Sequence, residues 1–435
     1  MLKLTAKIIF LSFFISVSSQ TPTDYAKNVV TELASKEYSG RGYTNNGMGK
    51  AADYIAAQFE KTGLKKVHNS YFQEFSYPIN IIESSELKIN DKKLKFGEDY
   101  LINPLSPIAS GKFKPLVFKS DIMDSIYVDN NYDYYYSELD KYENQAVVFP
   151  IAIFPDHYSS GGVTAKDLYK QISNAIIDNS ASEKIAAVLE ITDTKLTHSL
   201  SQKQSKTVGF TIKNTSITLP IETVEYDVKA SFNPDFKTKN VLGMIEGQEK
   251  DSTIFITAHY DHLGKIGDTY FPGANDNASG VAFLLAMAKY FKVHKPKYTM
   301  VFVAFAGEEV GLVGSTYFVK NSPFPLKNIK YLFNFDIMGT GEDGIQIVNS
   351  TKYPKVYNAL AELNVKHSLL KNIKQRGESC NSDHCPFDKA KVPSFFTYTL
   401  GGVSYYHDIN DRAETLPLSK FKDILYLFTQ YIESL

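Results

Sequence analysis

The sequence lacks most of the marks of a specialised binding, fibrous or membrane protein. Its 47 Lys and Arg residues almost balance its 48 Asp and Glu residues, so no basic surplus favours nucleic acid as a partner. No fixed-period repeat and no low-complexity tract is present. Beyond the N-terminus, no apolar run is long enough for a membrane span. With 43% hydrophobic and 22% charged residues, the composition is typical of a soluble globular protein.

Cysteine is scarce as well, because the sequence contains only two, Cys380 and Cys385. In an oxidising compartment they are close enough in sequence for a local disulfide, whose main effect would be to shape the loop between them. Two free buried thiols are the alternative. The sequence leaves both possibilities open.

The first nineteen residues have the pattern of a signal peptide. Lys3 and Lys7 give a positive start, an apolar run follows over residues 8–17, and small residues precede Gln20. The run is too short to span a bilayer comfortably, and a buried N-terminal helix would usually carry a polar face. We therefore expect residues 1–19 to be removed and the protein to be exported to the periplasm or the medium.

The chain is long enough for one large domain and a smaller one. Between about residues 106 and 225 tyrosine and serine become common, and no cluster of acids, bases or metal ligands stands out. We interpret this segment as a small inserted α+β domain. The flanking segments 20–105 and 226–435 are then the two parts of the larger domain.

Hydrophobic patterns predict the elements of both domains. In the insert we expect a helix over 165–174 and strands over 146–151, 185–191 and 217–221. In the larger domain we expect helices over 22–35, 48–62, 280–291, 309–319 and 419–434, and extended segments over 71–82, 252–258, 299–306, 331–335 and 394–399. Continuous apolar strands that alternate with helices indicate an α/β fold, in which helices cover both faces of a mostly parallel sheet.

Acidic and histidine residues gather at or near the ends of the strands of the larger domain. Ligand sites in open α/β sheets lie at the carboxyl ends of the strands, so these residues are expected to converge. They are His259 and Asp261, Asp276, Glu308 and Glu309, Asp336, and His407. Taken singly, each has an ordinary structural explanation, such as a helix N-cap for Asp276 or solvated first-turn acids for Glu308 and Glu309.

Taken together, these residues predict a metal centre. Nitrogen and oxygen donors without thiolate suit Zn²⁺, with Mn²⁺ or Co²⁺ as conceivable substitutes. One ligand from each of the five clusters gives five protein ligands, which exceed the roughly three that one catalytic zinc takes. One carboxylate that bridges two ions about 3.5–4 Å apart explains the number. The adjacent Glu308 and Glu309 can then divide the work, one as a ligand and the other as a proton carrier.

Six stretches in the larger domain resemble the co-catalytic zinc exopeptidases of metallopeptidase family 28. They are AHYDHLG (258–264), GANDNASG (273–280), FAGEEVGLVGS (305–315), NFDIMG (334–339), SDHCPF (382–387) and YYHDINDRAET (405–415). The resemblance implies a three-layer αβα, phosphorylase/hydrolase-like domain with a mixed sheet. The insert resembles a protease-associated domain on weaker grounds.

The resemblance also implies roles for individual residues. His259 and Asp336 would hold one zinc, Glu309 and His407 would hold the other, and Asp276 would bridge the two ions. Asp261 would orient His259, and Glu308 would be the general base. Tyr406, or its neighbour Tyr405, corresponds to a tyrosine that polarises the scissile carbonyl in some members. The peptide bond between Asp276 and Asn277 would be cis. His262, Asp383 and His384 stay undecided, with His262 interpreted as a loop residue.

The expected function is that of a secreted aminopeptidase acting on peptides. A carboxypeptidase or dipeptidase of the same family is the first alternative, because the metal site is shared. We expect it less because the chain ends soon after its last motif. Glutaminyl cyclases use one zinc, which disagrees with the presence of both His259 and Asp336. A non-catalytic receptor-like relative is the last alternative, and the filled ligand positions argue against it.

Overall fold

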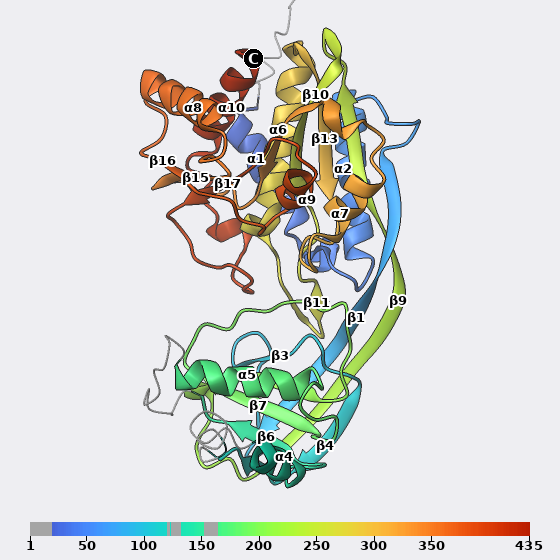
Figure 1. Ribbon diagram of the computed structural model, residues 1–435, viewed down its shortest axis with the longest axis vertical. Coiled ribbons are helices and arrows are strands. Elements are labelled where there is room, and N and C mark those ends of the chain that lie inside the picture. The colour runs from blue at the N-terminus through green and yellow to red at the C-terminus, as the bar shows by residue number, and fades with distance from the viewer. Residues whose placement is uncertain (1–19, 120–121, 123–131, 152–163) are drawn as a thin grey trace, which may run out of the picture.

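The computed structural model describes residues 20–119, 122, 132–151 and 164–435. The predicted signal peptide, residues 1–19, lies outside the described residues. The chain forms two lobes that are joined by the long antiparallel strands β1 (Phe72–Ile89) and β9 (Val224–Ile245), as Figure 1 shows. No helix within the described part of the chain is both long and apolar enough to cross a membrane.

The larger lobe is built on one mixed sheet whose central strands β13, β10, β14 and β17 run parallel. The order across this sheet is β16 (Ile373–Gln375), β15 (Gly344–Val348), β17 (Ser394–Leu400), β14 (Ile329–Phe335), β10 (Glu249–His259), β13 (Tyr298–Phe305), β9, β1 and β2 (Lys92–Lys93), with β4 (Ala109–Phe113) paired to β9. The expected α/β class is confirmed. The four parallel strands place their carboxyl ends at one edge.

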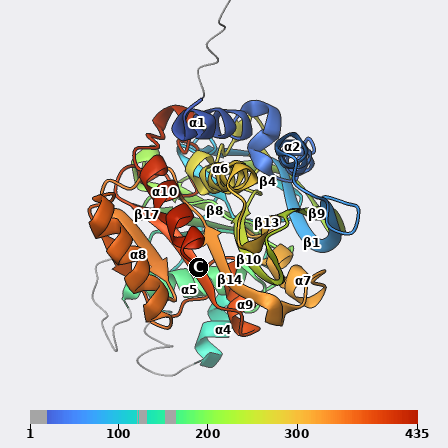
Figure 2. The same cartoon turned by 90° about the horizontal axis from the view of Figure 1, so that it is seen from above.

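Helices cover both faces of this sheet, as the view from above shows (Figure 2). On β10, Ile254 and Ile256 belong to one apolar core, whereas Phe255 between them belongs to another, because successive side chains of a strand point to opposite faces. The first core is shared with α1 (Pro22–Leu33), α2 (Gly47–Thr62), α6 (Gly280–Val293), α8 (Pro354–His367) and α10 (Phe421–Glu433). The second is shared with α7 (Val313–Lys320) and α9 (His384–Lys389).

The smaller lobe has its own sheet of five strands, of which β5, β6, β7 and β8 run parallel and β3 antiparallel. In order these are β3 (Tyr100–Ile102), β8 (Val208–Lys213), β7 (Ala187–Thr192), β6 (Ala146–Phe149) and β5 (Leu116–Val117). One face packs against the C-terminal half of β1 and the N-terminal part of β9. The other face packs against α4 (Tyr132–Asp140) and α5 (Ala165–Ile177). Most of its residues fall within the segment 106–225, while β3 precedes it.

Most predicted elements are found within a few residues of their expected limits, but two predictions are wrong. The strand expected over 217–221 is absent, and β8 lies earlier, at Val208–Lys213. Pro220 has no N–H to give to a strand neighbour. The helix expected from Glu309 begins only at Val313, because Gly311 and Leu312 both have positive φ. Glu308 and Glu309 therefore lie in a turn, not in the first turn of a helix.

Candidate metal centre

Three neighbouring parallel strands deliver the predicted acids and histidine to one place. His259 is the last residue of β10, Glu308 and Glu309 follow β13, and Asp336 follows β14 directly. Since β10 pairs in parallel with both β13 and β14, these residues leave the sheet at the same edge. The convergence expected from the sequence is present in the fold.

The His259 ring faces two carboxylates. Its Nε2 lies 3.2 Å from Asp276 Oδ1 and 3.3 Å from Asp336 Oδ1. All three residues are buried. The other ring nitrogen, Nδ1, is 3.2 Å from the main-chain oxygen of Asp261, which leaves Nε2 as the atom directed between the carboxylates. One nitrogen and two carboxylate oxygens within this distance can hold a divalent ion.

Asp261 supports both sides of this group. Its carboxylate lies 3.8 Å from His259 Nδ1, and it accepts hydrogen bonds from the backbone N–H groups of Glu308 at 3.2 Å and Glu309 at 3.3 Å. The side chain is fully buried, and burial raises its pKa to about 6. Asp261 thus fixes the turn that carries the two glutamates, in addition to its contact with the histidine.

A second group of donors surrounds Glu309. Its Oε2 lies 3.0 Å from His407 Nε2, and its Oε1 lies 2.6 Å from His262 Nδ1. His407 Nε2 is also 3.4 Å from Asp276 Oδ2, the carboxylate oxygen that does not face His259. Asp276 therefore stands between the two groups, with one oxygen toward each. The donor atoms of His262, Asp276 and Glu309 also lie close enough together to hold an ion.

His262 is better placed than the sequence indicated. We interpreted it as a loop residue, but its side chain is buried against Glu309. The His-x-Asp-His spacing in 259–262 was a usable signal, because an additional histidine next to a predicted site tends to contact one of its members. Two residues, His262 and His407, thus compete for the place of the histidine ligand beside Glu309.

A chain of hydrogen bonds ends at the carboxylate oxygen of Asp336 that does not face His259. Thr257 donates to Asn334 at 2.8 Å, Asn334 donates to Ser382 at 2.9 Å, and Ser382 donates to Asp336 Oδ2 at 3.1 Å. The chain leaves Oδ1 of Asp336 toward His259. Ser382 lies just before α9, where Cys380 and Cys385 form a disulfide. Such supporting hydrogen bonds orient a ligand and tune its affinity for metal.

Arg41 is a supporting residue that sequence reasoning missed. The side chain is fully buried and donates hydrogen bonds to five main-chain carbonyls, at distances of 2.7–3.3 Å. They belong to Leu33, Tyr260, Pro272, Gly273 and Asp276. Four of the five lie in the two loops that carry His259 and Asp276. Burial lowers its pKa to about 10, an effect partly offset by Asp411 and Asp276, so the side chain stays charged at neutral pH.

Gly273 makes the approach of Arg41 possible. Its φ is +58°, and a Cβ at this position would collide with the side chains of His262 and Arg41. Just beyond it, the carboxylate of Asp411 accepts hydrogen bonds from the backbone N–H groups of Asn275 and Asp276 at 2.9–3.0 Å. The peptide between Asp276 and Asn277 is cis, as the sequence resemblance implied. The turn that presents Asp276 is therefore held on both sides.

Two further predicted residues border the site. Glu308 is partly exposed, and burial raises its pKa above the ordinary value for a glutamate. Tyr406 is exposed over 53% of its surface and stacks on the His407 ring, with 3.8 Å between the ring centroids. An exposed phenol beside a buried donor cluster is accessible to a substrate, whereas Tyr405 is less exposed.

The donor set fits zinc. The candidate residues offer imidazole nitrogens and carboxylate oxygens, and no thiolate is among them. Asp276, Glu309 and Asp336 are ionisable groups gathered in a small buried volume, and nearby positive charge favours their ionised forms. Arg41 supplies a single fixed positive charge nearby. Divalent ions at the two groups would supply the rest.

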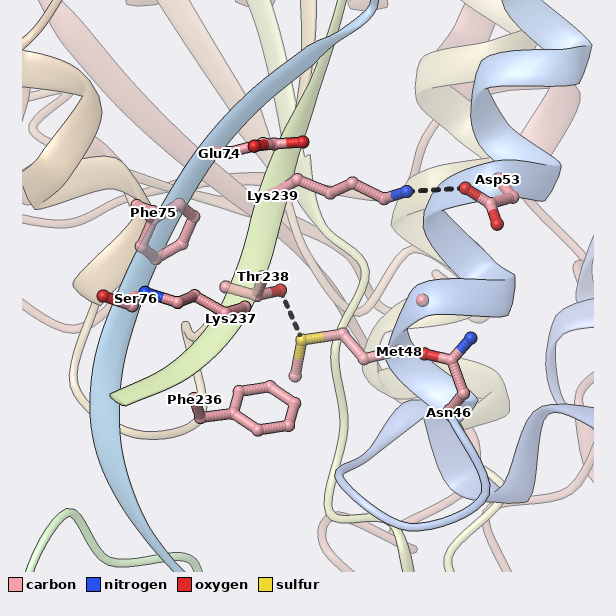
Figure 3. A pocket seen from close by; sticks show the side chains of 11 residues that line it. Asn46, Met48, Asp53, Glu74, Phe75, Ser76, Phe236, Lys237, Thr238 and Lys239 are labelled. Carbon is pink, nitrogen blue, oxygen red and sulfur yellow. Dashed lines mark hydrogen bonds and ion pairs between the residues drawn. The ribbon is translucent and has the colours of Figure 1, made fainter. Parts of the chain in front are cut away.

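A separate pocket of about 510 Å³ lies between α2 and the paired strands β1 and β9 (Figure 3). Its charged side chains are partly paired, since Lys239 Nζ lies 2.7 Å from Asp53 Oδ1. None of the candidate metal residues lines this pocket. It therefore lies apart from the donor cluster.

The part of the chain that carries the candidate metal residues is similar to known peptidases. Residues 240–432 match the model of peptidase family M28. Aminopeptidase YwaD of Bacillus subtilis (strain 168) is 30% identical over 162 residues, which are 36% of this chain and 34% of the relative. A probable zinc metalloprotease of Pyrenophora tritici-repentis (strain Pt-1C-BFP) is 29% identical over 194 residues, which are 39% of this chain and 40% of the relative. The matches thus span well under half of these curated relatives.

Solved structures match over nearly the whole chain. The zinc aminopeptidase BSAP from Bacillus subtilis has a TM-score of 0.66 at 19% identity and covers 95% of this chain and 94% of its own. An aminopeptidase from Aneurinibacillus sp. strain AM-1 has a TM-score of 0.62 at 18% identity, with 95% and 93% covered. At these identities the likeness shows the fold alone.

Proposed function

Because residues 240–432 match the model of peptidase family M28, we propose that the protein is a zinc-dependent exopeptidase that releases amino acids from the N-terminal ends of peptides. The observation that carries the proposal is the position of Asp276. Its two oxygens face two different histidines, at 3.2 Å and 3.4 Å, as a carboxylate between two metal ions would. Relatives and structural neighbours described as aminopeptidases support the choice of the N-terminal end.

We assign two zinc ions to this centre. One would be held by His259, Asp336 and Asp276, and the other by Glu309, His407 and Asp276. For the second ion we choose His407 over His262 for a physical reason. The Nδ1 of His407 is already bound to a main-chain oxygen, which leaves its Nε2 directed at Glu309 and Asp276 as a ligand. His262 instead uses its Nδ1 to hold Oε1 of Glu309.

In this mechanism the ions would acidify a water and polarise the scissile carbonyl. The protein's own groups move the protons. Glu308, which stands next to Glu309, would take a proton from the attacking water and pass it to the leaving amine. Burial raises the pKa of this carboxyl above the ordinary value for a glutamate, and a carboxylate can accept a proton and release it again. Tyr406, exposed beside His407, would donate a hydrogen bond to the substrate carbonyl.

The proposal extends to the rest of the chain. Residues 1–19 would direct export to the periplasm or the medium and be removed, so that the mature protein begins at Gln20. Residues 106–225 would be a protease-associated domain inserted between the two parts of the peptidase domain, 20–105 and 226–435. N-terminal sequencing of protein recovered from its producing cells tests the first point, and an uncleaved Met1 would contradict it.

Digestion of defined peptides, followed by mass spectrometry, tests the activity. Each peptide is supplied with a free and with an acetylated N-terminus. We expect stepwise loss of residues from free N-termini and no cleavage of acetylated peptides. Loss from the C-terminus, or indifference to acetylation, would instead indicate a carboxypeptidase. Absence of any cleavage by the zinc-loaded protein would favour a binding role.

Metal analysis tests the assignment of two ions. We expect about two zinc ions per chain after equilibrium dialysis, and removal of zinc by a chelator should lower the thermal unfolding temperature reversibly. A ligand that binds only the folded state at 1,000 times its dissociation constant stabilises by about 4 kcal/mol. Calorimetry with and without chelator measures the change. A single zinc per chain, or none, would contradict the assignment.

A further inference from the structure

The loop between β7 and β8 leaves the smaller lobe and contacts the larger one, between the two lobes in Figure 1. We call residues 195–202 of this loop the strap. By sequence the strap belongs to the insert, in which we recognised no residue with a chemical role. In the structure it contacts both loops that carry the donors of the second group, those of Glu309 and His407.

His198 and His407 form a reciprocal pair of hydrogen bonds between the strap and the second group of donors. The ring Nδ1 of His407 lies 2.8 Å from the main-chain oxygen of His198, and the backbone N–H of His198 donates to the oxygen of His407 at 3.3 Å. A carbonyl accepts but cannot donate, so Nδ1 must carry the proton in this contact. In the neutral ring, the form that binds a metal, the lone pair of His407 is then on Nε2, the atom that faces Glu309 and Asp276.

Lys195 holds the backbone on which His407 sits. Its ammonium donates to the main-chain oxygens of Ser404 at 3.1 Å and Tyr406 at 2.9 Å, and it lies 3.6 Å from a carboxylate oxygen of Asp408. These three residues surround His407, whose own φ is +53°. A residue other than glycine keeps this conformation only where its surroundings impose it. The lysine supplies part of that constraint.

The same strap reaches the turn of Glu309. Gln202 donates to the main-chain oxygen of Val310 at 2.6 Å. Ser201 accepts, through its main-chain oxygen, a hydrogen bond from the backbone of Asn80 on β1 at 2.9 Å. The strap is therefore tied to the larger lobe next to both metal-donor loops.

Apolar packing fixes the strap between these ties. The ring of His198 is buried and stacks on Phe271, with 4.9 Å between centroids. Leu196 is buried in the same small cluster, together with Phe271, Leu263 and Leu101. Leu101 lies in the smaller lobe, whereas Leu263 and Phe271 flank the loops of the metal centre. The cluster gives the strap a defined position between the lobes.

From these contacts we propose that the strap is part of the metal centre, and that Lys195 is a positioning residue for His407. The inference rests on the proposed function, since it concerns the second zinc. The insert would then be needed for full occupancy of the second zinc position, while the first position, at His259 and Asp336, has no contact with the strap. Outer hydrogen-bond partners of a metal ligand typically contribute about 10- to 100-fold in metal affinity.

Zinc competition with a coloured chelator, on the full-length protein, tests the inference. For Lys195→Met we expect one zinc dissociation constant, that of the second position, to rise by about 10-fold or more, with the other constant unchanged. Lys195→Arg should restore most of the affinity, because a guanidinium can also donate to several carbonyls. Gln202→Ala should show a smaller rise at the same site. The turnover number should fall together with occupancy of the second site and recover when zinc is added in excess.

Lys184→Met is the matched control. Lys184 also lies in the insert and pairs with a carboxylate, that of Glu143 at 3.5 Å, but its side chain is 60% exposed and its partner lies just before β6 in the smaller lobe, not in a metal-donor loop. Its zinc constants should equal those of the unaltered protein. Equal zinc constants for Lys195→Met and the unaltered protein would overturn the inference while leaving the proposed function in place. An unaltered protein that binds no second zinc would overturn the proposed function itself.

Discussion

Replacement of Glu308 by glutamine should abolish most of the peptidase activity while the protein keeps its metal. Glutamine has nearly the shape of glutamate but cannot take up a proton, so the substitution removes proton transfer without opening a cavity. The backbone N–H of residue 308, which Asp261 holds at 3.2 Å, is unaffected. Since general acid–base catalysis contributes about 10²- to 10⁴-fold, the turnover number should fall by at least about 100-fold. Steady-state kinetics on a peptide with a free N-terminus measures the loss.

The neighbouring substitution Glu309→Gln is the matched control, because the two residues share one turn and differ in their contacts. Glu309 faces His407 and His262 with its two oxygens, so its loss should lower zinc occupancy before anything else. Metal analysis should therefore show about two zinc ions in Glu308→Gln and fewer in Glu309→Gln. Activity that survives in Glu308→Gln would remove that residue from the role of base. Loss of zinc from it would instead make Glu308 a ligand.

Replacement of Arg41 by methionine should destabilise the fold by more than about 3 kcal/mol and weaken zinc binding as well. The guanidinium serves five main-chain carbonyls in a fully buried position, and methionine can serve none of them. Each buried acceptor left without a donor costs about 1–3 kcal/mol. The turn that presents Asp276 loses two of its ties, at Gly273 and at Asp276 itself.

Chemical unfolding with and without zinc separates the two effects of the Arg41 substitution. Arg412→Met serves as control, since Arg412 is exposed and its Nε donates to one carbonyl, that of Ile409. A change at such a surface position should stay within about 0.5 kcal/mol. Arg41→Lys should fall between the two, because one ammonium cannot reproduce the planar fork of donors. Arg41→Met as stable as the control would refute the supporting role.

Several features of the candidate site could be predicted because they leave a pattern in the sequence. His259 and Asp336 each stand at the end of an apolar strand, and parallel strands end at a common edge. Such residues are polar where the local pattern is apolar, and the contrast is visible without a structure. The helix predicted from Glu309 instead begins at Val313, because the positive φ at Leu312 has no residue-type signal.

What the sequence by itself determined is the class of fold and most of the acids and histidines that gather at one edge of the sheet, since both follow from residue type and periodicity along the chain. Tertiary structure alone decided which groups hold the donors in place. Arg41 has no acid beside it in sequence to mark it as buried, and its partners are carbonyls 8 to 235 positions away. The acceptor that orients His407 is the main-chain oxygen of His198. Every residue carries such an oxygen, so only the path of the folded chain can select one of them.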